Sequence, residues 1–547
     1  MEYVPPVPGF APTLPNLIAD VSTRFADNEF LVDGALRLTY AQAERSAAQV
    51  ARGLLALGVG KAARVAIVLP DKADWVIAWW AAARIGALTI PLSTLYQARE
   101  LAWALQQADV DTVIIAHGFL GVDYLERLEQ AVPGLAQQAS PQLFLKSQPY
   151  LRRVIVWGEC DRPWAIQGAK ALDAIAQEHA AIDDAYLREV ESRIEPSDLL
   201  IGICTSGSSS VPKIVLHTHA SMIRATYAVR ESFLGLIRAE DRCYSGMPMF
   251  WVGGLNVNLM PATYAGACVV FAPSPKATDV LDVIVSEHIT RVAMWPTQYK
   301  PLMDLAAARG VDLHHITMVN RPQDRAVPTV PPERRIVSLL GMTETFGPHG
   351  FGNWDEDLGE ANGGSFGRQV QGIERRIVDP LTHAELPRGQ EGELQVRGFP
   401  MMEGYYKRER SEVFLPDGWF ATGDICAINA DGCLFFRGRM GDMIKTLGAN
   451  VSPQEVEAVM MTCPGVAEAV VVGVPDADAG ERVVAVVVAR QGESVDGETL
   501  RKRLLGEMSA YKVPREILVM AHEQIPRTGA AKVQRNALKA LLEQRGR

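Results

Sequence analysis

The stretch Leu199-Leu200-Ile201-Gly202-Ile203-Cys204-Thr205-Ser206-Gly207-Ser208-Ser209-Ser210-Val211-Pro212-Lys213 joins an apolar run to a loop of small hydroxyl residues, one glycine and one lysine. The apolar run predicts a buried strand, and the loop follows its end. Such a loop offers amide, hydroxyl and ammonium donors that suit a polyphosphate. It is not a Walker A loop, because the Gly-x-x-x-x-Gly-Lys-Ser/Thr spacing is missing. Taken alone, the motif is equally compatible with a Ser-rich surface loop.

On both sides of this stretch, short β-branched runs alternate with helical stretches. Residues 65–69, 89–92 and 112–115 are predicted strands, and residues 98–108 are a predicted helix. The same rhythm returns between residues 198 and 340. It predicts parallel α/β layers with functional sites at the carboxyl ends of the strands.

The pattern changes in the last third of the chain. Residues 364–440 carry short strands and turns, which predict a β-rich subdomain. Beyond residue 442 the pattern is α+β, and Ser452-Pro453-Gln454-Glu455 has the form of a helix capping box. We therefore predict an α/β fold with a large layered N-terminal domain at residues 1–441 and a small C-terminal α+β domain at residues 442–547.

Composition excludes several classes of protein. The 547 residues are 48% hydrophobic and 22% charged, as in a folded globular protein of several structural units. The net charge of −10 disfavours a nucleic acid or an anionic membrane as the main partner. The apolar run at residues 75–83 is too short to span a membrane and predicts a buried helix.

The cysteines and the termini indicate the compartment. The seven cysteines are scattered and form no Cys-x-x-Cys pair, so neither a disulfide framework nor a zinc cluster is indicated. The first residues show no basic region followed by an apolar run. We expect a cytoplasmic protein.

Four further motifs follow the Ser-rich loop in order. They are Gly341-Met342-Thr343-Glu344, Thr422-Gly423-Asp424, Gly438-Arg439-x-x-Asp442-x-Ile444-Lys445 and Pro526-Arg527-Thr528-x-x-x-Lys532. With the loop, these motifs resemble those of the adenylate-forming (ANL) superfamily, and most closely its acyl-CoA synthetase or ligase branch. The superfamily also contains peptide-synthetase adenylation domains and luciferases. Five motifs in the same order are far more specific than any one of them.

The resemblance implies a nucleotide site for ATP or an acyl-adenylate. Thr343 would meet the α-phosphate, Glu344 would hold Mg²⁺, and Lys532 would be the catalytic lysine. Asp424 and Arg439 would bind the ribose. The residues implied to bind the nucleotide are Thr205, Ser206, Gly207, Ser208, Ser209, Lys213, Asn320, Arg321, Gly341, Met342, Asp424 and Arg439.

The same residue types suit this chemistry on physical grounds. A carboxylate is a poor electrophile, and joining it to AMP supplies a good leaving group while pyrophosphate departs. The reaction needs a cation near the developing negative charge, which Lys532 can supply. It also needs a metal held by a hard oxygen ligand such as Glu344. Taken singly, these two residues are typical of a solvated surface, and Asp424 is typical of a turn or a helix cap.

The resemblance also implies two steps in two conformations. After the acyl-adenylate forms, the mobile C-terminal domain would turn about Asp442 so that the CoA sulfur can attack the acyl carbon. Asp442 and Lys445 would belong to the hinge, and Gly448 and Ala449 would line the CoA tunnel. Without the resemblance, Gly448 is equally typical of a simple turn. The implied cofactors and co-substrates are ATP or acyl-AMP, Mg²⁺ and coenzyme A.

The expected substrate is a small carboxylic acid. Amino-acid-activating relatives carry an aspartate in the segment that corresponds to residues 247–251, and this chain has no acidic residue there. Because an unpaired buried ammonium is costly, the acid should lack an α-amine. Trp251, Gly253, Gly254 and His349 are the predicted pocket residues, and the glycines predict a roomy pocket for a bulky alicyclic acid. A core tryptophan and ordinary glycine turns are the alternatives.

Several positions depart from the family pattern. Ser210 and Ile214 stand where the phosphate loop carries glycines, and Ala531 replaces the glycine before Lys532. An isoleucine is a poor substitute if the position needs a positive φ or a close backbone approach. Residues 318–322 and Leu340 differ from the strip that holds adenine.

The adenine positions do not separate the two half-reactions, because an acyl-adenylate also contains adenine. The departures at Ser210, Ile214 and Ala531 suggest that carboxylate adenylation is weakened or lost while thioester formation from a supplied acyl-adenylate survives. That hypothesis requires a partner ligase that makes the acyl-adenylate. A complete ligase with tolerated substitutions is the competing interpretation. Two further alternatives are an acyl-AMP ligase that loads a carrier protein, and a catalytically silent protein that binds acyl nucleotides.

Overall fold

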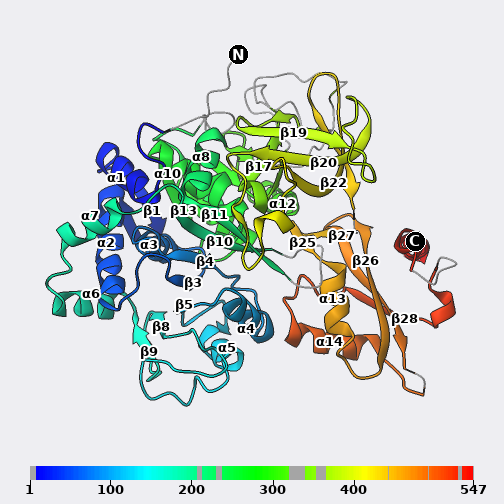
Figure 1. The fold of residues 1–547 in the computed structure, drawn as a ribbon, viewed down its shortest axis with the longest axis horizontal. Helices are drawn as coiled ribbons and strands as arrows, with labels where there is room; N and C mark the ends of the chain where they lie inside the picture. The colour runs from blue at the N-terminus through cyan, green and yellow to red at the C-terminus, as the bar shows by residue number, and fades with distance from the viewer. Residues whose placement is uncertain are drawn as a thin grey trace. The chain divides into compact units, whose positions relative to one another are not determined.

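The structure is a computed structural model that describes residues 8–205, 212–229, 237–319, 339–352, 362, 365–440, 443–490, 492–527 and 533–545. The chain divides into two compact units (Figure 1). One contains residues 1–94, 102–204 and 214–437, and the other contains residues 95–101, 205–213 and 438–547. The larger is called the main unit below and the smaller the C-terminal unit.

Two large sheets organise the main unit, and most of their strands are parallel. The eight-stranded sheet runs in the order β21 (Gly404–Tyr405), β11 (Lys213–Thr218), β10 (Leu199–Thr205), β4 (Leu88–Pro91), β3 (Arg64–Val68), β5 (Thr112–Ala116), β8 (Arg153–Trp157), β9 (Ala165–Gln167). The six-stranded sheet runs in the order β15 (Thr317–Val319), β14 (Arg291–Ala293), β12 (Arg242–Ser245), β13 (Cys268–Phe271), β1 (Glu29–Asp33), β2 (Leu36–Thr39). The predicted parallel α/β layers are confirmed.

Helix α3 (Ala73–Ala83) lies between the two sheets, because it contacts β3 and β4 of one and β1 of the other (Figure 1). Apart from Asp74 in its first turn, its sequence is apolar, as burial between two sheets requires. Trp75, Trp79 and Trp80 are fully buried. The predicted buried helix at residues 75–83 is therefore confirmed.

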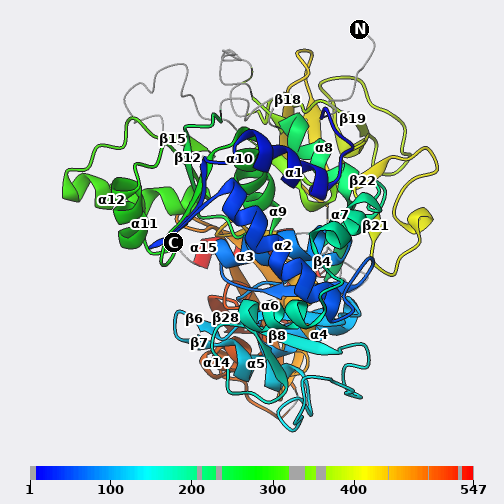
Figure 2. The ribbon, with the colours of Figure 1, turned by 90° about the vertical axis from the view of Figure 1, so that its left-hand side faces the viewer.

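Further helices cover the sheets. Helix α2 (Tyr40–Ala56) packs against α6 (Gly168–Glu178), as Figure 2 shows. A Cβ at Gly53 would lie 2.5 Å from the Leu172 carbonyl oxygen, so the two helices approach too closely for a side chain there. The other helices before residue 310 are α1 (Leu14–Arg24), α4 (Ala98–Gln107), α5 (Tyr124–Ala131), α7 (Asp184–Ser192), α8 (His219–Val229), α9 (Val252–Gly254), α10 (Met260–Ala265), α11 (Ala277–Ser286) and α12 (Pro296–Arg309).

Two smaller antiparallel sheets follow; the second lies within the predicted β-rich region at residues 364–440, whereas the first takes two of its three strands from before that region. One consists of β16 (Leu339–Met342), β17 (Gly347–Phe351) and β18 (Arg368–Gln369). The other consists of β19 (Ile373–Val378), β20 (Glu391–Gly398), β22 (Phe420–Ile428) and β23 (Leu434–Arg439). The strand predicted around residues 392–398 is β20.

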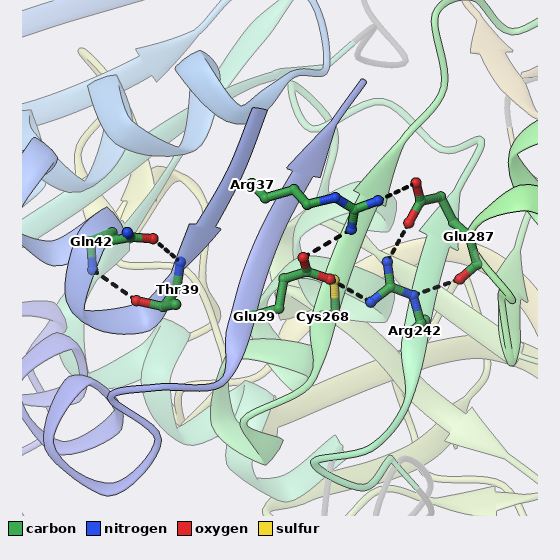
Figure 3. Close-up of polar contacts among 7 residues, drawn as sticks. All are labelled: Glu29, Arg37, Thr39, Gln42, Arg242, Cys268 and Glu287. Carbon is green, nitrogen blue, oxygen red and sulfur yellow. Dashed lines mark hydrogen bonds and ion pairs between the residues drawn. The ribbon is translucent and has the colours of Figure 1, made fainter. Parts of the chain in front are cut away.

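A network of four charges ties the amino-terminal edge of the six-stranded sheet (Figure 3). Arg242 at the start of β12 pairs with Glu29 at the start of β1 and with Glu287 after α11, each at 2.5 Å. Arg37 on β2 pairs with the same two carboxylates at 2.9 and 2.6 Å. Burial raises the pKa of Glu29, but hydrogen bonds from Arg242 and Arg37 outweigh it and bring that pKa below its usual value.

The C-terminal unit has a five-stranded sheet with a core on each face (Figure 1). Along β26 (Val466–Asp476), Val471 faces α13 (Pro453–Met460) and α14 (Gly497–Glu507), whereas Val470 and Val472 face α15 (Arg535–Arg545). This alternation is the two-residue period of a strand buried on both sides. The other strands are β24 (Ile444–Thr446), β25 (Ala449–Val451), β27 (Gly480–Ala489) and β28 (Glu516–Val519).

The predicted helix start at Ser452 is confirmed, but only half of its capping box forms. The Ser452 hydroxyl accepts the Glu455 N–H at 3.3 Å. The Glu455 carboxylate instead pairs with the buried Lys512 ammonium at 2.7 Å, because a buried charge needs a partner more than a helix amide does. The domain boundary near Asp442 falls outside the described residues and stays a prediction.

The expectations about membrane spans and disulfides concern the helices and the cysteines. In that part of the chain, no helix combines the length and the apolar character needed to cross a membrane. All seven cysteines are buried free thiols, in agreement with the expected lack of a disulfide framework.

We predict that Arg242→Ala lowers the free energy of unfolding by about 1–3 kcal/mol, because it leaves two partly buried carboxylates facing each other. Arg37→Ala is the control, since its side chain is 47% exposed and should contribute less than about 1 kcal/mol. Urea denaturation at low and high salt measures both. Equal losses of unfolding free energy for the two variants would contradict the prediction, because they would show that Arg242 contributes no more than Arg37.

Candidate functional site

The carboxyl ends of strands from both large sheets meet through two side-chain contacts within the main unit. Asp33 ends β1, and its carboxylate pairs with Lys72 after β3 at 2.7 Å. The neighbouring Asp71 accepts the Met249 N–H at 3.0 Å, and Met249 follows β12. Ligand sites in parallel sheets form at these edges.

The Thr343–Glu344 turn is held by elements far apart in the sequence. The Glu344 carboxylate accepts the Tyr405 hydroxyl at 2.8 Å, and the Glu344 carbonyl accepts the Met402 N–H at 2.8 Å. The Thr343 carbonyl lies 2.7 Å from His217 Nε2. His217 and Tyr405 come from the paired strands β11 and β21. The half-buried Glu344 is therefore presented on a fixed turn.

His217 can act here only as a neutral donor. Burial lowers its pKa to about 4, although the contact with the Thr343 carbonyl opposes the shift. The ring is fully buried and packs edge-on against Phe346 at 5.0 Å. Since a carbonyl only accepts, Nε2 carries the proton at neutral pH. Sequence reasoning missed His217 and Tyr405; the proximity of His217 to the Ser-rich loop was the available signal for the histidine.

The tight approach of β16 and β17 explains the glycine of the Gly-Met-Thr-Glu motif. A Cβ at Gly341 would lie 2.5 Å from the Gly347 carbonyl oxygen. Met342 ends β16 and Thr343 begins the following helical turn. Phe346 then has a φ of 49°, a left-handed conformation that is unfavourable for an aromatic residue. Gly341 and Met342 thus place the turn.

Asp424 lies on a second fixed turn, within β22. Its N–H donates to the Thr422 hydroxyl at 3.0 Å, and that hydroxyl donates to the Leu394 carbonyl at 2.7 Å. Gly423 has a φ of 74° and donates its N–H to Glu393 at 3.2 Å. Glu393 is a further buried residue that sequence reasoning missed.

An aromatic cluster surrounds the half-buried Trp251. Its ring contacts Phe250 at 5.2 Å and Trp295 at 6.5 Å, both edge-on. Gly253 lies under this cluster, since a Cβ there would lie 3.7 Å from the Trp295 ring. The fold of the main unit thus places Trp251 and Gly253 next to Trp295, which the sequence did not indicate as a pocket residue.

The glycines near this cluster do not leave open space. A Cβ at Gly254 would collide with the Pro248 carbonyl, and one at Gly347 would collide with the Asn256 side chain. Asn256 is fully buried and donates to the Phe346 carbonyl. Backbone atoms beside Gly254 and the Asn256 side chain beside Gly347 occupy the space next to these glycines, so their small size is no measure of pocket volume.

His349 is fully buried in β17. Among the residues that the structure describes, neither ring nitrogen has a hydrogen-bond partner. Burial, aided by the charge of Arg375, lowers its pKa to about 3, so it stays neutral at ordinary pH.

The remaining predicted residues lie elsewhere in the chain. Thr205 ends β10 and Lys213 begins the adjacent β11. In the C-terminal unit, Lys445 is exposed on β24, Gly448 has a φ of 83° and Ala449 begins β25. Arg439 ends β23. The predicted residues outside the described part are Ser206, Gly207, Ser208, Ser209, Asn320, Arg321, Asp442 and Lys532.

The donor set fits the implied magnesium ion. Within the described ranges, no three His, Cys, Asp or Glu side chains gather as a metal site. Mg²⁺ commonly takes one or two carboxylates, with the remaining positions filled by phosphate oxygens and water. The single carboxylate of Glu344 suits that mode, and Tyr405 fixes one of its oxygens.

Comparison with known proteins identifies the family. Residues 18–406 match the model of the AMP-binding enzymes, and residues 455–532 match the model of their C-terminal domain. The chain belongs to the AMP-binding enzyme family. The predicted ligase of the adenylate-forming superfamily is confirmed by this membership.

Similar proteins match over most of their length. A putative acyl-CoA synthetase of Bacillus subtilis is 28% identical over 541 residues, which cover 96% of each chain. An indoleacetate–CoA ligase of Aromatoleum aromaticum is 29% identical over 517 residues, covering 92% of this chain and 93% of the ligase. The structure of an amide bond synthetase from Marinactinospora thermotolerans has a TM-score of 0.78 at 24% identity, covering 97% of this chain and 99% of that one. The last comparison confirms the fold.

We predict that the buried histidines make the fold sensitive to acid. A histidine kept neutral contributes stability above its unfolded pKa of about 6.5, and this is lost by up to about 1.4 kcal/mol per pH unit as the pH falls towards the folded value. His349→Leu should remove the part of this acid-dependent destabilisation that comes from His349. The unfolding free energy at pH 8 should stay equal or rise, because the His349 ring nitrogens have no partner among the described residues.

His219→Leu is the matched comparison. Burial also lowers the pKa of His219 to about 4, but its Nδ1 accepts the Leu14 N–H at 3.1 Å. This variant should lose about 1–3 kcal/mol at pH 8 because the amide is left unpaired. Thermal unfolding between pH 4 and pH 8 measures both variants, and an unchanged acid slope in either would contradict the assignment of a neutral ring.

Proposed function

We propose that this enzyme is a complete carboxylic acid–CoA ligase. It would join the acid to AMP with release of pyrophosphate and then pass the acyl group from the adenylate to the CoA sulfur with release of AMP. The observation that carries the proposal is the Thr343–Glu344 turn, which His217, Met402 and Tyr405 fix from separate strands and loops. Such preorganised polar groups suit the charge that develops in phosphoryl chemistry.

Each motif receives a role in this proposal. The hydroxyl and amide groups after β10 and the Lys213 ammonium would hold the phosphates, while Asp424 and Arg439 would hold the ribose. Thr343 would contact the α-phosphate. Lys532 would donate to the charge that develops as the carboxylate attacks. Mg²⁺ at Glu344 would neutralise phosphate charge during departure of pyrophosphate.

A complete ligase is favoured over one confined to thioester formation. The strongest argument for an impaired adenylation site was Ile214 in place of a glycine. Ile214 lies in the regular strand β11, and its φ is not positive, so the substitution does not strain the backbone. The proposal therefore requires no partner ligase. Ser210 and Ala531, which lie outside the described residues, keep the thioester-only enzyme as the second candidate.

We propose an aromatic acid without an α-amine as the substrate. Trp251, Phe250 and Trp295 form an aromatic cluster that favours a planar ring. A relative named as an indoleacetate–CoA ligase supports the same class. The bulky alicyclic acid has no support from the glycines, because neighbouring groups occupy their space. The seven free thiols agree with a reducing compartment such as the cytoplasm.

We predict that Lys532→Ala separates the two steps. Pyrophosphate release from acid, ATP and Mg²⁺ should fall about 10²–10³-fold, because the variant loses a cation at the reacting phosphate. Thioester formation from a synthetic acyl-adenylate and CoA should change less than about tenfold. A panel of aromatic, aliphatic and alicyclic acids in both assays would identify the substrate.

The unmodified enzyme provides the control. No pyrophosphate release with active thioester formation would overturn the complete ligase and support the thioester-only enzyme. Binding without turnover in both assays would indicate a silent acyl-nucleotide-binding protein. Preference for a carrier-protein phosphopantetheine over CoA in direct competition would indicate a carrier-loading ligase.

We predict that Gly448→Val slows thioester formation at least tenfold and leaves pyrophosphate release within about twofold. A valine at a φ of 83° is strained and would also narrow the proposed thiol channel. Gly492→Val is the matched control, since Gly492 has a φ of 82° and no atom of the described residues lies within 4 Å of an added Cβ. Equal effects of the two variants on the thiol step would mean that strain alone is responsible.

A further inference from the structure

Asp71 has an unusual place in the main unit. It follows β3 of the eight-stranded sheet, yet its carboxylate accepts a hydrogen bond from Met249, which follows β12 of the six-stranded sheet. The two residues are 178 positions apart, and the O···N distance is 3.0 Å. This contact therefore joins the carboxyl-end loops of two different sheets.

The segment from Gly246 to Trp251 is held at both ends: the Trp251 N–H donates to the Pro248 carbonyl at 3.1 Å and its ring packs against Trp295, while hydrogen bonds hold the start. The Gly246 N–H donates to the Ala293 carbonyl at 2.9 Å, and the Gly246 carbonyl accepts from the Gln298 side chain at 3.2 Å. Ser245 accepts the Met247 N–H at 3.0 Å. Further along, Asp71 supplies the side-chain contact that holds the segment from the opposite sheet. Trp251 comes two residues after that contact.

We propose that Asp71 is a positioning residue: it holds the Met249 amide and thereby fixes the segment that carries Trp251 against the acid substrate. The inference rests on the proposed function, because that function places Trp251 beside the acid. Asp71 does not contact the reacting atoms. It acts through the backbone of Met249.

The charge state of Asp71 adds a pH dependence to this role. Burial raises its pKa to about 7, although the Met249 hydrogen bond opposes the shift. A carboxylate is a stronger acceptor than a carboxylic acid, so the segment is held most firmly above pH 7. The stability of the whole protein depends on pH in the opposite direction to the strength of this contact. Between about pH 4 and pH 7 the unfolded chain ionises first, so stability decreases as the pH rises through this window and is constant above it.

The charged and titratable groups near Asp71 have other contacts. Tyr124 at the start of α5 and Tyr244 on β12 both feel the Asp71 charge, and burial raises the pKa of each phenol above its usual value. Lys72 and Asp33 form an ion pair beside Asp71 at 2.7 Å. Asp74, on the first turn of α3, also has a raised pKa, because of burial, but it accepts from Trp157 and not from the 246–251 segment.

These contacts define the test. Asp71→Ala removes the acceptor, and Asp71→Asn keeps a neutral acceptor of the same shape. Asp74→Asn is the matched control, because it neutralises a nearby carboxylate outside the contact. The readouts are KM and kcat for the best acid between pH 5.5 and pH 8.5, and the hydrogen-exchange protection of the Met249 amide.

The proposal predicts that KM of the unmodified enzyme rises about five- to twentyfold as the pH falls from 8.5 to 5.5. Asp71→Asn should abolish this rise, and Asp71→Ala should raise KM by a similar factor at every pH while kcat stays within about twofold. Met249 protection should fall in Asp71→Ala and remain in Asp74→Asn. An unchanged KM in Asp71→Ala, or the same KM–pH profile in Asp71→Asn as in the unmodified enzyme, would overturn the proposal.

The test also separates this inference from the proposed function. If the unmodified enzyme converts no acid, the proposed function fails, and amide exchange together with thermal unfolding still decides whether Asp71 fixes the segment. The melting temperature of Asp71→Asn should then exceed that of the unmodified protein by a margin that grows up to about pH 7. Unaltered Met249 protection in Asp71→Ala would overturn the inference by itself.

Discussion

Two parallel sheets can share a site only if the loops at their carboxyl ends are held in a fixed relation. In the main unit, two carboxylates form this connection, one at or just after the end of a strand in each sheet. Asp33, at the end of β1, pairs with Lys72, and Asp71, beside that lysine, accepts the Met249 amide. The apolar helix α3 fills the space between the sheets and begins next to these contacts. The polar edge therefore depends on an apolar core for its position.

The opposite edge of the six-stranded sheet is fixed by different means. There, Arg242 on β12 and Arg37 on β2 each pair with both Glu29, at the start of β1, and Glu287, after α11. Each guanidinium in this network contacts two carboxylates, so the opposite charges compensate one another. At the carboxyl edge, Asp71 has one amide for a partner and an elevated pKa, and burying it costs stability. Such a cost is typical of functional positions.

The sequence predicted the layers, the β-rich region and the ligase family because these depend on local periodicity and on motifs in order. Strands such as β3 and β5 are rich in β-branched residues, and α3 is apolar except for Asp74. The contacts that organise the site were not predictable in the same way. Tyr405 meets Glu344 across 61 residues and His217 meets Thr343 across 126, so neither has a local signal. The glycines misled for a related reason, since only the folded backbone shows that Asn256 and the Pro248 carbonyl occupy their space.

The central claim is that a carboxylate is activated by direct transfer to AMP. The most direct measurement uses the acid labelled with ¹⁸O in both carboxylate oxygens, with mass analysis of the nucleotide products after turnover with ATP and CoA. The account predicts one ¹⁸O in AMP and none in pyrophosphate, because the oxygen that attacks the α-phosphorus stays with AMP when the thiol displaces it. Release of ADP with ¹⁸O in inorganic phosphate would contradict the account, since it would show activation through an acyl phosphate.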